Sequence, residues 1–368
     1  MLITDVRAHH VRIPYDAGVA SFKQGASAIA ALDIVLVEVS TDAGLTGWGD
    51  AWGYVCPQTT CAAIAEMIAP QARGLEAPDA SGIAAFMERI QRNLHLFGRY
   101  GVTMFAMSGL DIALWDLAAR AKGEPLHRLI GARKRPRIPA YASLLRIGDP
   151  DLVASECAAA LRRVYPAIKL HETTVPTVVA ARRAIGVGVP LMVDMNCPMD
   201  EAAATAFAHD CRDAAPLFLE EPVWPPEDFK ALAKVRLNGG LAIAAGENAC
   251  TAHQFRHMMA EGAVTYAQPS VIKVGGITEY LKVVALADNM GVKLAPHSPY
   301  FGPGFLATLQ LMSLRDDGTF VEVFYTKPAA CLWGGRVEID AAGTVAVPEG
   351  SGLGYEPDTE VMERYRVA

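Results

Sequence analysis

The sequence has no basic excess, no long apolar run and no regular spacing of cysteines. Lysine and arginine number 33 against 40 acidic residues, and the formal charge is −7, so nucleic acid is not an expected partner. No stretch approaches the ~20 consecutive apolar residues of a membrane span, and the first residues lack the features of a secretory signal. We therefore expect a cytoplasmic protein without a membrane partner.

Motifs for nucleotide cofactors and for metal-binding cysteines are also missing. The seven cysteines are dispersed and odd in number, which favours free thiols in a reducing compartment over a disulfide framework. No GxGxxG follows a predicted strand and no P-loop occurs, so a nucleotide cofactor has no support.

The 368 residues suit two unequal domains. Residues 1–125 predict an α+β domain: a strand at 31–40, a glycine turn at 42–48, then helical stretches at 58–72, 81–95 and 103–122. Residues 126–345 are predicted to form the second domain. Residues 346–368 are rich in Gly, Pro and Glu and predict an extended return segment.

The second domain alternates short apolar strands with helical segments. Eight strands are predicted, at 138–143, 167–171, 191–196, 217–222, 241–248, 265–271, 292–298 and 320–325. Six of the intervening segments have helical composition, and a unit length of roughly 30 residues matches a parallel (β/α)₈ barrel. The predicted fold class is therefore α/β, a barrel with an additional N-terminal α+β domain.

A polar residue lies near the C-terminal end of each strand from the second to the eighth. In order they are Lys169, Asp194, Glu220, Glu247, Ser270, His297 and Glu322, separated by 23 to 27 positions. This near-constant step places the side chains at one height on consecutive strands, at the rim where barrel enzymes carry their active sites.

Asp194, Glu220 and Glu247 are the sharpest signal in the series. Three carboxylates on adjacent strands repel one another unless a cation lies between them, and oxygen-only ligands favour Mg²⁺ over zinc. The alternative is that these acids form ion pairs with Lys or Arg from neighbouring strands. A divalent cation here would stabilise the charge created when a base removes the α-proton of a carboxylate substrate.

Several short motifs together resemble the enolase superfamily, in its mandelate racemase/muconate lactonizing group. They are GLTGWGDA at 44–51, the passage 108–131, and then VDMN, LEEP, GEN, KVGG and PHS in barrel order. The resemblance implies that the N-terminal domain caps the barrel, that the C-terminal segment completes this cap, and that the chain forms a homo-oligomer. It also implies that the three acids bind Mg²⁺.

The same resemblance assigns roles to other residues at the rim. Lys169 matches the first lysine of the family's Lys-x-Lys pair, and His171 stands where the second lysine, usually the base, would be. His297 matches a histidine that acts as base or acid, and Glu322 matches an acid that hydrogen-bonds the substrate. A group near the metal or the substrate would include Asn196, Glu221, Ser270 and Lys273.

Ser270 is the larger departure from the family pattern. In the mandelate racemase branch an aspartate at this place orients the histidine, and in the other branch a lysine stands there. Without that carboxylate, His297 loses a raised pKa and a fixed tautomer, although it could still deliver a proton to a leaving hydroxyl.

Two loops of the cap are expected to face the barrel mouth, near residues 15–24 and 51–57. Phe22, Lys23, Trp52 and Tyr54 are the candidates for substrate specificity. The alternative is that the aromatic residues only pack between the domains.

The predicted function is Mg²⁺-dependent removal of the α-proton of a small-molecule carboxylate, with dehydration of a hydroxy acid or sugar acid as the leading reaction. Either His171 or Lys169 would be the base. A racemase or epimerase and a lactone cycloisomerase remain alternatives, because they share the fold and the metal site. A protein that binds acids without converting them is the remote alternative.

Overall fold

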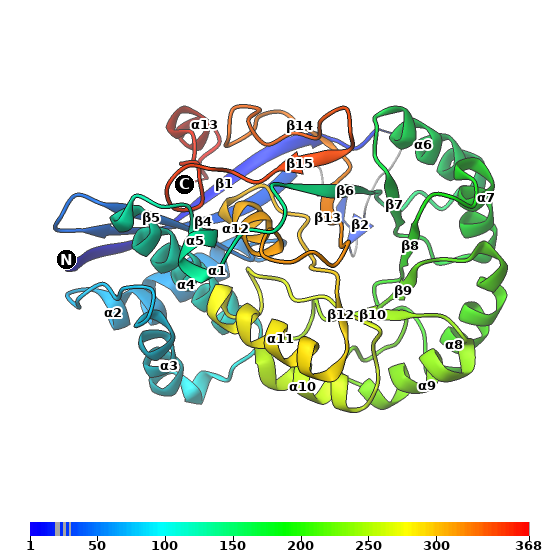
Figure 1. Cartoon of the computed structure of the whole chain (residues 1–368), viewed down its shortest axis with the longest axis horizontal. Helices are drawn as coiled ribbons and strands as arrows, with labels where there is room; N and C mark the ends of the chain where they lie inside the picture. The colour runs from blue at the N-terminus through cyan, green and yellow to red at the C-terminus, as the bar shows by residue number, and fades with distance from the viewer. Residues whose placement is uncertain (19–22, 25–26, 29–30, 368) are drawn as a thin grey trace.

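The computed structural model of the chain describes residues 1–18, 23–24, 27–28 and 31–367, with side chains for residues 1–18 and 31–367. Figure 1 shows two parts: the cap, with its blue strands and cyan helices on the left, and the larger ring of strands and helices on the right.

The cap is built on an antiparallel sheet in the order β14 (Lys327–Pro328), β1, β4 and β5. Strand β1 (Ile3–Asp16) pairs with β4 (Ala31–Thr41), which continues into β5 (Thr46–Ala51) through the predicted hairpin. The helical run that follows consists of α1 (Pro57–Ala63), a π-helical turn (Ile64–Ile68) and α2 (Ala69–Ala72), and α3 (Ile83–Asn93) comes next. Short β2 (Lys23–Gln24) and β3 (Ser27–Ala28) pair with each other.

Helix α4 (Gly101–Lys122) is the core of the cap and ends at Gly123, which has a left-handed φ of 68°. It packs on β5 so closely that a Cβ added at Gly49 would lie 1.9 Å from a carbonyl oxygen of α4, which only glycine permits. Among the described residues, α4 is the one helix long and apolar enough to cross a membrane, but 83% of that window is buried inside the protein. Its composition is therefore that of a core helix.

The eight predicted barrel strands are present and parallel. They are β6 (Arg137–Ser143), β7 (Ala167–Leu170), β8 (Leu191–Asp194), β9 (Phe218–Glu220), β10 (Ile243–Ala245), β11 (Tyr266–Ala267), β12 (Lys293–Leu294) and β13 (Val321–Phe324). Each pairs with the next from β6 to β12, and β13 returns to pair with β6.

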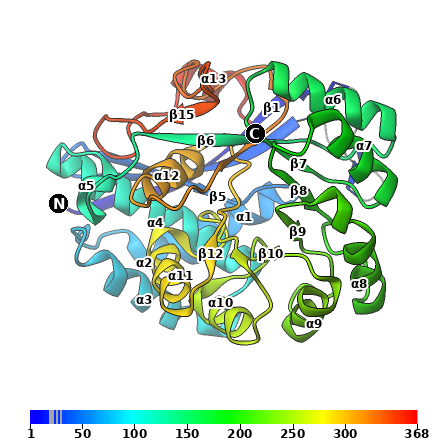
Figure 2. The same cartoon turned by 45° about the vertical axis from the view of Figure 1, so that its right-hand side comes forward.

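Helices surround this sheet, and Figure 2 shows several of them wrapping its outer side. They are α6 (Pro150–Arg162), α7 (Val175–Ile185), α8 (Glu201–Asp210), α9 (Phe229–Gly239), α10 (Thr251–Ala260), α11 (Gly276–Met290) and α12 (Pro303–Met312). A short α5 (Leu126–Ile130) leads from the cap into the barrel.

The interior of the barrel explains why charged side chains collect at one level. A buried layer contains Ala167, Met192 and Phe218. Side chains alternate along a strand, so the next inward positions, two residues later, are Lys169, Asp194 and Glu220. The apolar layer below thus forms the floor of a charged layer above.

The C-terminal part of the chain returns to the cap. Strand β14 (Lys327–Pro328) pairs with β1, and β15 (Thr344–Ala346) pairs antiparallel with β6. The Val367 amide donates to the His10 carbonyl at 2.9 Å. The segment is not wholly extended as predicted, because α13 (Thr359–Arg364) forms a helical turn capped by the Asp358 side chain. The domain boundaries after residues 125 and 345 stay predictions.

Two buried acids of the cap contact the first turns of barrel helices. Asp50 Oδ2 accepts the amide of Gly304 in α12 at 3.1 Å, and Asp111 Oδ1 accepts the amide of Thr278 in α11 at 3.0 Å. The residues preceding these helices are glycines without side-chain caps, so the cap supplies the acceptors that the helix N-termini need.

Candidate active site

The polar residues predicted at successive strand ends converge at the top of the barrel. They are Lys169, Asp194, Glu220, Glu247, Ser270, His297 and Glu322, all buried except the partly exposed Glu247. Asp194 and Glu220 are direct register partners on β8 and β9, which places their side chains at the same height.

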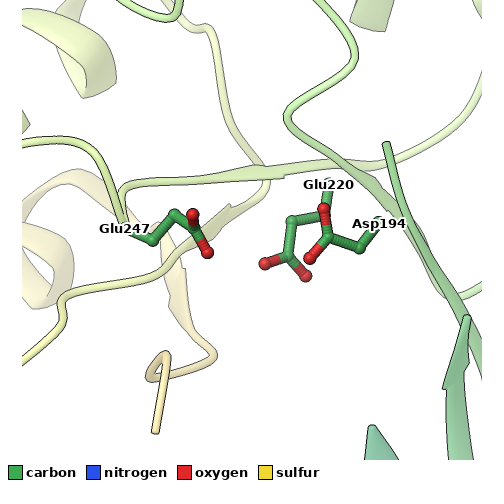
Figure 3. A group of neighbouring side chains, drawn as sticks. All are labelled: Asp194, Glu220 and Glu247. Carbon is green, nitrogen blue, oxygen red and sulfur yellow. The ribbon is translucent and has the colours of Figure 1, made fainter. Parts of the chain in front are cut away.

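The three predicted metal ligands form one cluster. Figure 3 shows Asp194 and Glu220 on neighbouring strands and Glu247 on the turn after β10, with the carboxylates directed toward a common space. One oxygen from each lies within 4.8 Å of the others. An oxygen-only donor set of this size fits a hard divalent cation.

Lys169 satisfies part of this negative charge. Its Nζ lies 3.1 Å from Asp194 Oδ2, 3.1 Å from Glu220 Oε1 and 2.8 Å from Glu322 Oε1, so the predicted ion-pair alternative is realised on this side of the cluster. One ammonium is shared among three carboxylates, however. Burial and the charge of Asp194 hold the pKa of Glu220 well above its ordinary value. A second positive charge is needed to keep the whole set ionised, and a metal ion would supply it.

The bonding of Lys169 also decides its protonation. Burial alone would lower its pKa, but the surrounding carboxylates, Glu220 foremost, raise it well above the ordinary value. Lys169 is therefore an ammonium in this arrangement and has no free lone pair with which to accept a proton.

His171 lies beside the cluster with its tautomer fixed. Its Nδ1 is 2.5 Å from the Leu144 carbonyl oxygen, and because a carbonyl only accepts, Nδ1 is the donor. Its Nε2 lies 3.1 Å from Asp194 Oδ2 and is the nitrogen directed toward the acids. The arrangement leaves Nε2 as the position that can exchange a proton with a bound molecule.

His297 lies on the opposite side of the cluster, with Nε2 2.9 Å from Glu247 Oε2. Its Nδ1 is 3.3 Å from both the Ser270 hydroxyl and the Tyr300 hydroxyl. The Tyr300 hydroxyl donates to the His297 carbonyl at 2.6 Å and also contacts Ser270 Oγ. Since the tyrosine proton is used on the carbonyl, its oxygen accepts from Ser270, and Nδ1 of His297 becomes the donor to this pair.

Ser270 stands where the family pattern has an aspartate, and its hydroxyl contacts that of Tyr300 beside His297. The two hydroxyls orient the ring of His297 and fix Nδ1 as a donor without adding a negative charge. The loss of a fixed tautomer that Ser270 led us to expect is thus compensated by Tyr300, which sequence analysis missed. Tyr300 follows His297 by three positions, and nothing in the pattern marks it.

The predicted neighbours of the metal site occupy strained turns. Asn196 follows Asp194 with a φ of 54°, and Glu221 follows Glu220 with a φ of 41°, conformations that non-glycine residues adopt at a cost. Burial and the charge of Glu247 raise the pKa of Glu221 to about 8. Lys273 lies beside this group, with Nζ 3.3 Å from Asn248 Oδ1.

The cap contributes two of its predicted aromatic residues. Trp52 and Tyr54 line the cavity above the acids. The Trp52 ring lies 6.0 Å from the ring of His297, and Lys273 Nζ lies 4.8 Å from its centroid. Phe22 and the side chain of Lys23 lie outside the described residues.

The cavity has a volume of about 900 Å³, within the range of small-molecule sites. Besides His171, His297 and Glu247, its wall includes Arg146, which sequence analysis also missed. A signal for it existed, because Arg146 precedes Lys169 by 169 − 146 = 23 positions, the step of the rim series. The predicted rim series begins at the second strand, so Arg146, which follows the first strand, lies outside it.

Comparison with known families matches both parts of the chain. Residues 11–131 match the N-terminal domain of mandelate racemase/muconate lactonizing enzymes, and residues 152–361 match the enolase C-terminal domain-like family.

Relatives of the chain include enzymes named for a sugar acid and for a sugar-acid lactone. The chain is 28% identical over 351 residues to the D-gluconate dehydratase of Thermoproteus tenax, covering 90% of this chain and 69% of that one. It is 29% identical over 393 residues to the D-galactarolactone cycloisomerase of Agrobacterium fabrum, covering 100% and 99%.

Solved structures agree over the full length. The 3,6-anhydro-D-galactonate cycloisomerase of Zobellia galactanivorans superposes with a TM-score of 0.87 at 26% identity, covering all of both chains. A racemase of Streptomyces coelicolor with bound magnesium gives 0.85 at 26% identity, again over both whole chains. With the barrel, its cap and both family matches in place, the chain belongs to the mandelate racemase/muconate lactonizing enzymes of the enolase superfamily.

Proposed function

We propose that this enzyme is a Mg²⁺-dependent dehydratase of a hydroxy acid or sugar acid. The observation that carries the proposal is the pair of imidazoles on opposite sides of one acidic cluster. His171 Nε2 lies 3.1 Å from Asp194 and His297 Nε2 lies 2.9 Å from Glu247, and both rings line the same cavity. A carboxylate substrate held between them would have one proton-transfer group on each side.

Asp194, Glu220 and Glu247 would hold the Mg²⁺ ion. Their donor set is oxygen-only, and the shared ammonium of Lys169 leaves the group short of positive charge, so the residues fit the ion. When bound, Mg²⁺ would supply positive charge that stabilises the second negative charge developing on the substrate carboxylate. Lys169 would add to this stabilisation as an ammonium, and Glu322 would hold Lys169 in place.

His171 would be the base in this proposal. Its Nε2 takes the α-proton while Nδ1 keeps its bond to the Leu144 carbonyl, so the ring stays fixed during the transfer. Lys169 is the poorer base, because its protons are already donated to three carboxylates.

His297 would complete the elimination. The bond from the β-carbon to its hydroxyl breaks, and Nε2 of His297 donates the proton with which that hydroxyl leaves as water. The resulting enol then tautomerises to a 2-keto acid. Ser270 and Tyr300 would keep the ring in the donating orientation throughout.

Lactone cycloisomerisation is the second candidate. The match to the D-galactarolactone cycloisomerase covers the whole of this chain and 99% of that one, a fuller coverage than the match to the D-gluconate dehydratase. Epimerisation uses the same two histidines on opposite faces of one carbon and differs only in returning the proton to that carbon.

The test is a screen of hydroxy acids, sugar acids and lactones in D₂O with Mg²⁺, following α-deuterium incorporation and 2-keto acid formation together. His171→Ala and His297→Ala are the catalytic variants, and His257→Ala, on the outer helix α10, is the matched control. A 2-keto acid that disappears in both catalytic variants supports the dehydratase. Deuterium exchange without a keto acid supports epimerisation or cycloisomerisation, and no exchange on any acid contradicts the α-proton mechanism.

Location and assembly are further parts of the proposal. All seven cysteines are free thiols, which supports a reducing compartment such as the cytoplasm. We also infer a homo-oligomer, by resemblance to the family.

A further inference from the structure

Arg146 is held in a fixed position at the wall of the cavity. It follows strand β6 and is partly buried. Its Nε donates to the His171 carbonyl at 2.8 Å, and its Nη2 donates to the Met195 carbonyl at 3.4 Å. Among the described residues its Nη1 has no hydrogen-bond partner, so one edge of a fixed guanidinium group remains available in a wall of the cavity.

The other basic side chains that line the cavity already face carboxylates. His171 contacts Asp194, and His297 contacts Glu247. Lys273 lies close enough to Glu247 for its charge to lower the pKa of that carboxyl.

Arg146 differs from these three side chains. Within the described part of the chain no carboxylate lies within ion-pair distance of it, and its anchors are neutral carbonyls. Glu172 is close in the fold, but its carboxylate accepts the amides of Ile147 and Gly148 at 2.8 and 3.1 Å. A partly buried guanidinium without an anion is costly unless a ligand provides one.

We propose that Arg146 binds a second carboxylate of the substrate, so that the preferred substrates are dicarboxylic sugar acids (aldarates) rather than monocarboxylic ones (aldonates). This inference rests on the proposed function, in which the first carboxylate lies at the acidic cluster. The anchors of Arg146 are the carbonyls of His171, the proposed base, and of Met195, which directly follows Asp194. The guanidinium therefore stands in the same cavity as the reacting end of the substrate.

The geometry of the side chain suits this role. A guanidinium presents parallel N–H groups that match a carboxylate, and charge-assisted bonds of this kind are stronger than neutral ones. In an aldonate the same end of the molecule is a hydroxymethyl group, which offers no negative charge.

The experiment compares matched acids, galactarate with D-galactonate and D-glucarate with D-gluconate, with Mg²⁺ present. The wild type is expected to show a higher kcat/KM for each aldarate than for its aldonate. Arg146→Gln is expected to lower that ratio by about 10- to 100-fold, the size of effect for one lost charge-assisted contact. Arg146→Lys keeps the positive charge without the parallel N–H groups, so its aldarate-to-aldonate ratio should lie between those of the wild type and Arg146→Gln. Arg183→Gln, an exposed arginine of α7, should leave the ratio unchanged.

If the substitution acted only through loss of the two hydrogen bonds to the carbonyls, it would disturb His171 and lower kcat/KM for both acids equally. An Arg146→Gln enzyme with reduced rates and an unchanged ratio, or a wild type that prefers aldonates, overturns the proposal.

Binding of galactarate measured by calorimetry, with Mg²⁺ and independent of turnover, separates this inference from the proposed function. Binding that weakens in Arg146→Gln while no acid undergoes exchange would support the inference and refute the proposed function. Exchange on aldonates, together with aldarate binding that does not depend on Arg146, would support the proposed function and refute this inference.

Discussion

The rim of the barrel and the cap both contain buried acids, which look alike in the sequence and differ in their partners. The rim acids Asp194 and Glu220 face Lys169 and His171 from the same barrel. The cap acids Asp50 and Asp111 face backbone amides at the starts of α12 and α11.

This difference in partners distinguishes a candidate active site from a contact that holds the cap on the barrel. A lysine and a histidine beside several carboxylates give a group whose charge balance depends on a ligand. Backbone amides at a helix start give fixed partial charges that need no ligand. An isolated acid in an apolar stretch therefore does not indicate function until its partners are known.

The largest expected effect is on the rim. Glu220→Gln removes one charge from the proposed metal ligands and is expected to lower turnover by more than about 10³-fold, since stabilisation of developing charge is lost. Mg²⁺ affinity, measured by calorimetry, should fall with it. Because burial raises the pKa of Glu220, thermal stability without metal should not decrease. Unchanged Mg²⁺ affinity would remove Glu220 from the ligand set.

His171→Asn should rank next. The variant lacks the proposed base, so α-deuterium incorporation should fall by about 10²- to 10⁴-fold, while Mg²⁺ affinity is retained. Lys169→Met serves as the comparison: an electrostatic role predicts weaker substrate binding along with slower exchange. Exchange that survives His171→Asn and vanishes in Lys169→Met would reverse the assignment of the base.

His297→Asn should separate the two halves of the reaction. Exchange of the α-proton is expected to continue, while 2-keto acid formation falls by about 10²-fold or more because the leaving hydroxyl lacks its proton donor. NMR of the same reaction in D₂O measures both. Equal loss of both signals would argue that His297 shares in removing the α-proton.

A smaller effect is expected at the hydroxyl pair. Tyr300→Phe removes one oxygen that accepts from Ser270 and from His297 Nδ1, and a loss of about 5-fold in keto acid formation corresponds to one hydrogen bond. Tyr355→Phe, at a tyrosine that is not among the residues lining the cavity, is the matched control. Ser270→Asp in the Tyr300→Phe background tests whether a carboxylate restores the orientation.

The smallest effect on activity, and a clear effect on stability, is expected in the cap. Burial raises the pKa of Asp111 from 3.8 to about 7, so the folded state holds a proton that the unfolded state has released. Stability should therefore fall as pH rises from about 4 to about 7. Asp111→Asn keeps the acceptor for the Thr278 amide and should remove this fall, gaining up to roughly 4 kcal/mol above pH 7.

Thermal unfolding from pH 5 to 8 measures the effect of Asp111→Asn. Parallel stability profiles for the wild type and the variant would show that Asp111 does not titrate in this window.

The fold and the rim could be predicted from sequence because both follow from regular spacing. Lys169, Asp194 and Glu220 stand two positions after inward apolar residues, and a barrel repeats that geometry on every strand. The spacing of three positions from His297 to Tyr300 follows no such repeat, because the place of Tyr300 depends on the path of a loop. Arg146 was within reach of the series, but its role depends on the carbonyls it binds.

The helix in the C-terminal segment was not predicted either. Helix α13 spans six residues, too short for a periodic pattern, and its Asp358 cap becomes recognisable only with the structure. The partners of Asp50 and Asp111 depend on how two separately predicted domains dock, which no local pattern encodes.

The contacts of Asp50 and Asp111 have a mechanical consequence for the enzyme. The turn before α12 carries His297 and Tyr300, and the turn before α11 carries Ser270 and Lys273. If the cap rotated away from the barrel as a rigid body, both helix N-termini would lose their hydrogen-bond acceptors. The turns that hold the proton donor would then no longer be fixed. We therefore expect substrate to enter and product to leave through small movements of cap loops at the cavity mouth, such as residues 52–57. The contacts of Asp50 and Asp111 with the barrel would stay intact during these movements.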